Sequence, residues 1–299
     1  MRKSFNYKAK VSDQTALQCW YWIEQCRHLY NAALEQRIIL WNHKKQSLTY
    51  VDQTYEMKYL RKEIPQYKNI NSQVLQDPLK RIDLAFKAFY KRCKRGDKKS
   101  GYPKFKKEGM YRSITFKNTG WELDGNVLDI YKVGKFKLFL SRPILGEIKT
   151  ITIRVSRTNK WFVSFSCDNV EKTKHKPIEN TITIRDDGSL TRPPELDKTL
   201  KRLKDLQLLI SYKDVDSNRR MKMRHQIECV YEKMKNQRKD FIHKNTTNLV
   251  KNYNKIIIIE SDKKNKDKPL YEMGWYSFLE ILVQKANEYG TELVFKKGI

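Results

Sequence analysis

The sequence predicts an α+β protein in which a small β-barrel carries a helical bundle inserted after its first strand and is followed by a mixed α/β module. Apolar residues recur at helical spacing through residues 11–94, and the spacing changes to strand-like alternation after Gly96. A charged segment at residues 168–180 then separates these strands from a second region. With 299 residues, of which 39% are hydrophobic, the chain is long enough to bury two cores.

One proline complicates the helical part of this pattern. Pro78 falls inside an otherwise helical stripe, and a proline in a helix interior costs about 3 kcal/mol. The helix is therefore expected either to kink at Pro78 or to start afresh there, with Asp77 as its cap. The elements predicted before Gly96 are a strand at 4–10 and helices at 12–43, 49–63 and 71–94.

The strands after Gly96 are short and are separated by Gly, Asn or Asp turns, as expected for an antiparallel barrel. They are predicted at residues 113–117, 127–131, 136–140, 148–155 and 161–167. The second module is predicted to contain a strand at 181–184, basic helices at 194–210 and 217–253, a strand at 256–260, a helix at 272–289 and a last strand at 292–295. The predicted domains are a barrel at 1–10 and 113–170, a helical bundle at 11–112, and the second module at 171–299.

The net charge of +28 predicts a polyanionic partner held through many phosphate contacts, and nucleic acid is the leading candidate. A membrane surface is the competing partner for a basic protein. However, no apolar run approaches the 18 residues of a membrane span, and the amino terminus has no signal-peptide core. We therefore expect a cytoplasmic protein, located at the nucleoid, with no membrane partner.

The five cysteines are scattered and never form a C-x-x-C pair, so the sequence predicts neither a disulfide framework nor a zinc site. One carboxylate stands out instead. Glu260 ends the apolar strand 255–259, a position that nuclease carboxylates can occupy. A pair of Mg²⁺ ions needs several carboxylates to hold it, so a Glu that merely ends a core strand is the favoured interpretation of Glu260 taken alone.

Basic and aromatic residues alternate after the third predicted helix, where aromatic planes can stack bases while cations neutralise phosphates. A solvated charged face is the ordinary alternative. A second basic face lies on the helix at 217–253. The residues expected to contact a nucleic-acid backbone are Lys91, Arg92, Lys94, Arg95, Tyr102, Lys104, Phe105, Lys106, Arg219, Arg220, Arg224, Arg238, Lys239, His243 and Lys244.

Five stretches resemble TnpB, the transposon-encoded RNA-guided nuclease related to type V CRISPR effectors. They occur in the family's order over nearly the whole chain, and they read YNAAL at 30–34, SQVLQ at 72–76, GYPKFK at 101–106, RKDFIHK at 238–244 and GWYSFL at 274–279. The resemblance implies that the barrel is a wedge domain, that the inserted bundle is a recognition domain, and that the second module is a RuvC domain with an RNase H-like fold.

The chain also departs from the family. The segment that carries the family's first catalytic Asp is missing, because the strand 181–184 leads directly into Asp186 and Asp187. Glu260 matches the second catalytic carboxylate, and the sequence stops before the family's zinc ribbon and third catalytic Asp. This pattern resembles nuclease-dead repressors descended from TnpB. It leads us to expect a protein that is not an enzyme, with a vestigial Glu260, no zinc and no requirement for Mg²⁺.

The resemblance further implies two partners, a guide RNA bound by a protein monomer and a double-stranded target with a short flanking motif. Gln73 and Gln76 lie one helical turn apart, and Gln can bind adenine bidentately. An exposed polar helix face is the alternative. The positions matched to motif reading are Tyr50, Thr54, Ser72, Gln73, Gln76, Lys117 and Asn118.

Three other functions remain open. Asp186 or Asp187 could complete a metal site with Glu260, which would make the chain a guided endonuclease with a rearranged site. The chain could instead be a non-functional truncated TnpB remnant. A basic DNA-binding protein without a guide would need its own base-reading module, and the sequence has no helix-turn-helix or zinc-finger pattern.

Overall fold

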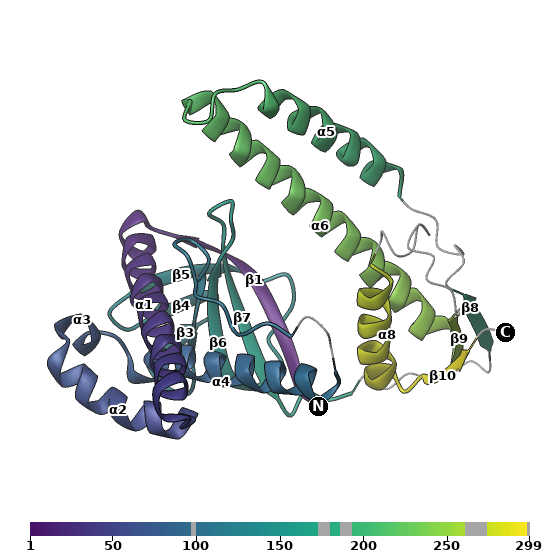
Figure 1. Cartoon of the computed structure of the whole chain (residues 1–299). Helices are drawn as coiled ribbons and strands as arrows, with labels where there is room; N and C mark the ends of the chain where they lie inside the picture. The colour runs from purple at the N-terminus through teal and green to yellow at the C-terminus, as the bar shows by residue number, and fades with distance from the viewer. Residues whose placement is uncertain (97–99, 173–179, 186–192, 261–273, 298–299) are drawn as a thin grey trace. The chain divides into compact units, whose positions relative to one another are not determined.

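The computed structural model describes residues 1–96, 100–172, 180–185, 193–260 and 274–297, and its chain forms two compact units, Met1–Val170 and Glu171–Ile299 (Figure 1). The Asp186 and Asp187 positions lie outside the described residues. The first unit combines helices with an antiparallel sheet and the second combines helices with a parallel sheet. The prediction of a mixed α and β fold is therefore confirmed, whereas the wedge and RuvC assignments stay predictions.

The first unit is built on a seven-stranded antiparallel sheet in the order β2-β6-β7-β1-β5-β4-β3. The first strand pairs with β7 and β5, both far along the chain from it, so the amino-terminal strand forms the centre of the sheet. The hairpin strand β3 was missed by sequence reasoning, because its alternating residues are only half-buried. The strands are β1 Lys3–Val11, β2 Ser113–Phe116, β3 Trp121–Asp124, β4 Val127–Ile130, β5 Gly134–Phe139, β6 Glu147–Val155 and β7 Trp161–Asp168.

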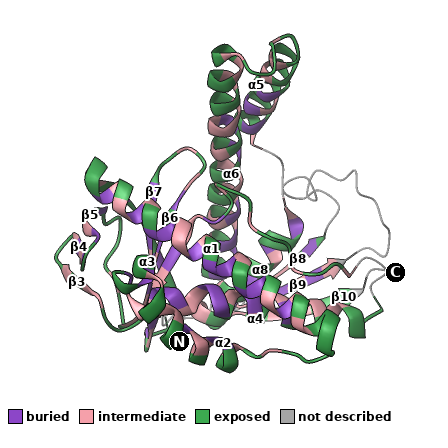
Figure 2. Ribbon diagram, turned by 60° about the vertical axis from the view of Figure 1, so that its left-hand side comes forward, coloured by how far each residue is buried: buried purple, intermediate pink, exposed green. Residues whose placement is uncertain are grey.

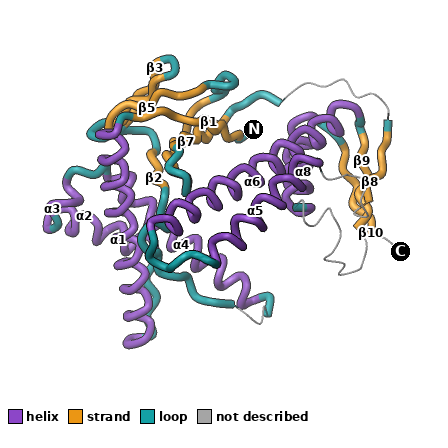
Figure 3. Tube along the Cα trace, turned by 90° about the horizontal axis from the view of Figure 1, so that it is seen from above, coloured by secondary structure: helices purple, strands orange, loops and turns teal. Residues whose placement is uncertain are grey.

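Four helices lie between β1 and β2, one more than the three predicted, and Figures 1 and 3 show α1 and α4 against one face of the sheet. Each of the three longer helices has a side-chain cap at its start, from Ser12, Thr49 and Asn71. Such caps satisfy backbone N–H groups that have no partner within the helix. The helices are α1 Asp13–Lys44, α2 Tyr50–Glu63, α3 Pro65–Lys68 and α4 Ser72–Lys94.

Helix α4 runs through Pro78 as one helix, so of the two alternatives for this residue the fresh start capped by Asp77 is excluded. A proline removes one backbone N–H and leaves the carbonyl four residues earlier without its helical donor. Here that carbonyl belongs to Val74, and the Cys26 thiol of α1 donates to it at 3.8 Å. Pro78 itself is buried. Packing between α1 and α4 thus compensates for the interruption.

The second unit has a three-stranded parallel sheet with β9 at its centre. Parallel neighbours need long crossovers. One crossover contains a hairpin of two long helices, and the described part of the other contains one helix. The strands are β8 Thr181–Arg185, β9 Lys255–Glu260 and β10 Glu292–Lys297, and the helices are α5 Pro194–Ser211, α6 Asn218–Asn252 and α8 Trp275–Tyr289.

Burial is uneven along the helical hairpin. Figure 2 shows α5 and the neighbouring part of α6 as largely exposed, with a few buried positions facing between them. The buried residues of this part form a small separate cluster of Leu196, Leu203, Val230 and Met234. All five cysteines are free thiols, as predicted. Among the helices of the described residues, none has both the length and the apolar content that crossing a membrane requires.

Candidate nucleic-acid interface

A groove opens where α4 begins, beside strand β2. Its volume is about 330 Å³. Four of the residues matched to motif reading line it together with four that sequence reasoning missed, giving Tyr50, Gln73, Gln76 and Lys117 with Asp77, Lys80, Thr115 and Thr150. The motif-reading groove, as we call it, is therefore bounded by amide, hydroxyl and ammonium groups.

A second groove of about 680 Å³ adjoins the first and shares Gln76 with it. Thr54 and Ser72, the next two residues matched to motif reading, line this basic groove. The remaining one, Asn118, is exposed beside Lys117 but lines neither cavity. The other residues that line the basic groove are Met57, Lys58, Arg61, Lys62 and Lys68.

The first turn of α4 positions the two glutamines. Asn71 caps the helix by accepting from the Gln73 backbone N–H at 2.8 Å, and the Lys117 backbone N–H donates to Gln73 Oε1 at 3.0 Å. The Gln73 oxygen is thus partly used within the protein, which leaves its Nε2 as the better group for a base. Among the described residues, no hydrogen-bond partner contacts the Gln76 amide, so both of its polar atoms are open to a ligand.

An ion pair lies under this turn. Asp77 Oδ2 is 2.7 Å from Arg81 Nη2, and Arg81 Nη1 donates to the Ser113 hydroxyl of β2 at 3.0 Å. Burial raises the pKa of the Asp77 carboxyl, while the neighbouring Arg81 opposes the shift. The pair ties α4 to β2 at the floor of the motif-reading groove. Its spacing of four residues on one helix is the sequence signal that could have revealed it.

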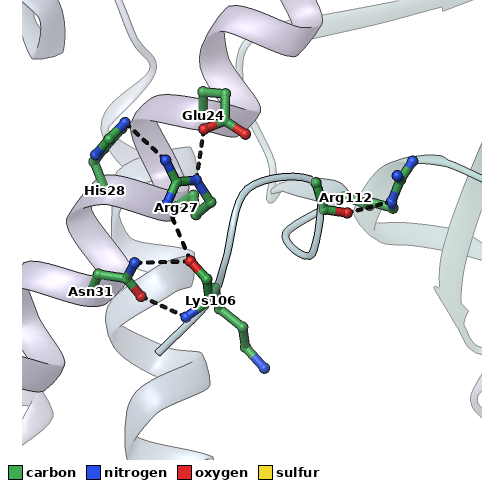
Figure 4. A network of polar contacts seen from close by, with 7 residues as sticks. Glu24, Arg27, His28, Asn31, Lys106 and Arg112 are labelled. Atoms are coloured by element: carbon green, nitrogen blue, oxygen red, sulfur yellow. Dashed lines mark hydrogen bonds and ion pairs between the residues drawn. The ribbon is translucent and has the colours of Figure 1, made fainter. Parts of the chain in front are cut away.

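The loop that carries GYPKFK is attached to helix α1, as Figure 4 shows. The Asn31 amide forms two hydrogen bonds with the Lys106 backbone, donating to its carbonyl at 2.9 Å and accepting from its N–H at 2.8 Å. Arg27 donates to the same carbonyl at 3.1 Å and is held by Glu24 at 2.6 Å. Two of the stretches behind the resemblance therefore meet here, with Tyr102 and Phe105 left half exposed.

The predicted backbone contacts differ in how far they are available. Along α4 and the following loop, Lys91, Lys94, Arg95 and Lys104 are exposed. On α6, Arg219, Arg224, Lys239 and Lys244 are exposed, with Lys244 paired to Asp240 at 2.8 Å, whereas Arg220, Arg238 and His243 are only partly exposed. Arg220 donates to the Ile210 carbonyl at 3.2 Å, so its guanidinium helps to close the turn between α5 and α6.

The residues named for a possible metal site are Asp186, Asp187 and Glu260, and the two aspartates lie outside the described residues. Glu260 ends β9 in register with Lys297 of β10, and only its backbone is described. Within the described ranges, no group of three His, Cys, Asp or Glu side chains could hold a metal ion. We therefore derive no catalytic step through a metal.

Comparisons with known proteins connect this chain to guided nucleases. Residues 177–266 match the family model OrfB_IS605, described as probable transposase. A "Putative RNA-guided DNA endonuclease" of Streptomyces pristinaespiralis is 24% identical over 98% of this chain and 77% of its own length. The "Putative RNA-guided DNA endonuclease InsQ" of Escherichia coli (strain K12) is 28% identical over 67% of this chain, which spans about half, 51%, of that relative.

Among solved structures, a Cas12f1 protein in a cryo-EM complex with single guide RNA and target DNA aligns with 99% of this chain and 85% of its own, at 14% identity and a TM-score of 0.34. The names of the two relatives correct one expectation. Both are endonucleases by name and the family model describes a transposase, so the prediction that the chain is not an enzyme is wrong on this evidence. Residues 177–266 are thus similar to the OrfB_IS605 family model, and the chain is similar to two proteins named as putative RNA-guided DNA endonucleases.

Proposed function

We propose that this protein binds a guide RNA and uses it to bind DNA beside a short duplex motif. The observation that carries the proposal is the gathering of six positions matched to motif reading around two adjoining grooves at the start of α4. These positions come from α2, α4 and the end of β2, so the fold brings them together from separate parts of the chain. The names of the relatives support the same function.

The side chains of the motif-reading groove suit the base edges of a duplex, and those of the basic groove suit its phosphates. Amide and hydroxyl groups form hydrogen bonds with base edges in the major groove, where each base pair presents a distinct pattern. The motif-reading groove supplies such groups from Gln73, Gln76 and Thr115. The basic groove supplies cations such as Lys58 and Arg61, which contact phosphates and add affinity without sequence information.

The protein would thus select only the flanking motif. The adjacent sequence would be selected by base pairing with the guide, as in other RNA-guided effectors. A short motif offers few phosphates, whereas the chain carries a net charge of +28. A structured guide RNA accounts for the excess, and the exposed cations of α6 and of the α4 loop are available to hold it. We expect one protein chain on each guide.

The first test is to purify the full chain from cells at moderate salt and to sequence the RNA that remains bound. The proposal predicts one discrete RNA species in stable complex with the protein. RNA-free protein that still recognises a specific DNA site would overturn it. A variant with Lys239 and Lys244 changed to Gln should retain less RNA, because both side chains are exposed cations on α6.

Guided binding would also repress transcription wherever the target overlaps a promoter, because the bound complex would exclude RNA polymerase. A reporter whose promoter carries the flanking motif and a guide match tests this directly. Expression should fall only when the matching guide is present. Equal expression with matching and scrambled guides would rule out repression by this route.

The endonuclease activity in the names of the relatives can be tested on the same complex. A guide-matched duplex is incubated with the complex and Mg²⁺, and the strands are separated by size. Cleavage that disappears in Glu260→Ala, while guided binding remains, would assign the activity to the end of β9. Cleavage that persists unchanged in Glu260→Ala would exclude this residue from the reaction.

A further inference from the structure

A second kind of site lies further along α4 than the motif-reading groove, toward the carboxyl end of the helix. A cavity of about 430 Å³ opens between the end of α1, the loop before α2 and the last turns of α4. This volume falls within the usual range for small-molecule pockets. We call it the aromatic pocket, because Trp41, Phe86, Tyr90 and Tyr102 all line it.

Most of the aromatic residues that line the aromatic pocket are exposed to solvent, unlike aromatic residues of a hydrophobic core. Trp41, Tyr90 and Tyr102 are 44%, 51% and 49% exposed as residues, so packing within the protein does not cover them. Tyr102 lies with its ring 4.8 Å from that of Phe89, centre to centre, and the planes are inclined by 30°. The contact with Phe89 thus holds the Tyr102 ring in place, while about half of the residue stays exposed to solvent. Aromatic surfaces of this kind stack nucleobases.

A buried guanidinium also lines the aromatic pocket. Arg37 is only 8% exposed, its Nε donates to Gln53 Oε1 at 2.8 Å, and its guanidinium carbon lies 5.4 Å from the centre of the Phe86 ring. Gln53 is itself fixed, since its Nε2 donates to the Ala33 carbonyl at 2.9 Å. Arg37 is therefore held in place before any ligand arrives.

The two outer nitrogens of the Arg37 guanidinium have no hydrogen-bond acceptor among the described residues. Nη2 is buried and has no hydrogen-bond partner, and no described residue accepts from Nη1. A buried donor without an acceptor destabilises the folded protein, and more so when the donor is charged. Desolvation accordingly lowers the pKa of Arg37. Such a cost is removed by a ligand that brings acceptors into the pocket.

The aromatic pocket is also lined by a hydrogen-bond acceptor, the carboxylate of Asp83. Asp83 lines it, and both of the ammonium groups that approach Asp83 contact Oδ2, Lys87 at 3.0 Å and Lys80 at 3.8 Å. A carboxylate has about four acceptor sites, so Asp83 keeps accepting capacity for a ligand beyond its two ammonium neighbours. The aromatic pocket thus combines the unpartnered guanidinium nitrogens of Arg37 and the carboxylate of Asp83 with aromatic walls.

We infer that the aromatic pocket binds a single unpaired guanine base, stacked on its aromatic walls. Guanine presents N7 and O6 as neighbouring acceptors, followed by the N1–H donor, and an Arg that contacts N7 and O6 is the commonest specific protein contact to a base. Adenine presents an amino donor where guanine has O6, so it would leave one Arg37 nitrogen unpaired. The inference rests on the proposed function, in which both the guide and the opened target supply unpaired bases.

The test uses fluorescein-labelled hexanucleotides of thymine, or of uracil in the RNA series, that carry one central variable base. Anisotropy titration of the full chain measures affinity for oligomers with guanine, 7-deazaguanine or adenine at that position. Phosphate contacts are the same in all of them, so differences report on the base alone. We expect guanine to bind about tenfold more tightly than adenine, with 7-deazaguanine between them because it lacks the N7 acceptor.

Substitutions in the aromatic pocket test whether this pocket is the source of the preference for guanine over adenine. Arg37→Gln and Asp83→Asn should reduce the preference for guanine, and Tyr102→Leu should weaken guanine and adenine oligomers alike. Lys94→Ala, an exposed cation on the same helix that does not line the pocket, should weaken all oligomers and leave the ratio unchanged. Thermal unfolding shows which variants are folded. If Arg37→Gln does not fold, the comparison of guanine with 7-deazaguanine on the unaltered protein decides.

Equal affinity for guanine, 7-deazaguanine and adenine would overturn the inference, as would an undiminished preference in folded Arg37→Gln. A preference confined to the ribose series identifies the base as one from the guide, and a preference confined to the deoxyribose series identifies it as one from the target. If the unaltered protein shows no preference for guanine but still binds DNA under the direction of a guide, the guanine pocket is refuted and the proposed function stands. Absence of any guide RNA in the purified protein refutes the proposed function instead.

Discussion

The two units of this protein bury their apolar residues differently. In the first unit, one continuous core joins the seven-stranded sheet to α1, α2 and α4, from Phe5 to Val170. In the second unit, the described residues form two separate clusters, one around the parallel sheet and α8 and one between α5 and α6. The first unit thus forms one continuous frame around the motif-reading groove. The second presents a long basic hairpin that has little core of its own.

This difference predicts where a core mutation will be felt most. Phe165 is fully buried in the centre of the first core, with its ring 6.0 Å from that of Tyr7. Phe165→Ala should lower the free energy of unfolding by about 3 to 5 kcal/mol, through lost burial and a residual cavity. Phe162→Ala, on the same strand but half-buried on the other face, is the matched control and should cost much less. Urea unfolding measures both, and equal losses would contradict a single tight core.

A smaller and more local effect is expected in the hairpin. Leu203 belongs to the small cluster between α5 and α6. Leu203→Ala should cost about 2 kcal/mol, at the low end for such changes, because the surrounding cluster is small. Hydrogen exchange should accelerate in α5 and the facing part of α6, while the amides of β9 keep their protection. Equal acceleration in β9 would show that the two clusters unfold together.

The smallest predicted effect concerns pH and one lysine of the second unit. Lys285 donates to the His243 carbonyl at 2.6 Å and to the hydroxyls of Thr246 and Thr247, and burial lowers its pKa to about 8. The folded state then holds fewer protons on this group than the unfolded state between that pH and the ordinary pKa of about 10.4. Stability should therefore rise with pH above about 8.

Lys285→Met provides the comparison for this pH dependence, because it removes the titrating group and keeps an unbranched side chain. The difference in unfolding free energy between the two proteins, measured from pH 7 to 9.5, should shift in favour of the native protein as pH rises. A difference that does not change with pH would contradict the assigned shift.

Much of the fold could be predicted because periodicity directly reflects burial. The change of spacing after Gly96 located the strands, and the helical insertion between β1 and β2 followed from it. The route of α4 through Pro78 could not be foreseen, since it depends on a thiol from α1 that packing brings to the Val74 carbonyl. The strand β3 was missed because its alternating residues are only half-buried and gave no clear pattern.

The candidate site was foreseeable only in part. The resemblance supplied the positions around Gln73 and Gln76, but not the Asp77 and Arg81 pair beneath them or the use of the Gln73 oxygen by the Lys117 backbone. The Asp77 and Arg81 pair was overlooked although its i,i+4 spacing on one helix could have revealed it, whereas the Lys117 contact joins residues far apart in the chain. The aromatic pocket depends likewise on Arg37, which looks like an ordinary helix residue until its burial and its unpaired nitrogens are seen.

The central claim is that the protein reads a flanking motif while the guide reads the adjacent target. The most direct measurement is selection of bound DNA from a duplex pool that has a fixed guide match beside randomised base pairs, followed by sequencing. The unaltered complex should enrich a short motif, and a pool without the guide match should enrich nothing. Gln76→Ala should relax one motif position by about 1 to 3 kcal/mol, whereas Gln66→Ala, an exposed glutamine of α3 that lines neither groove, should not. The same motif enriched by Gln76→Ala as by the unaltered complex, or enrichment independent of the guide match, would contradict the account.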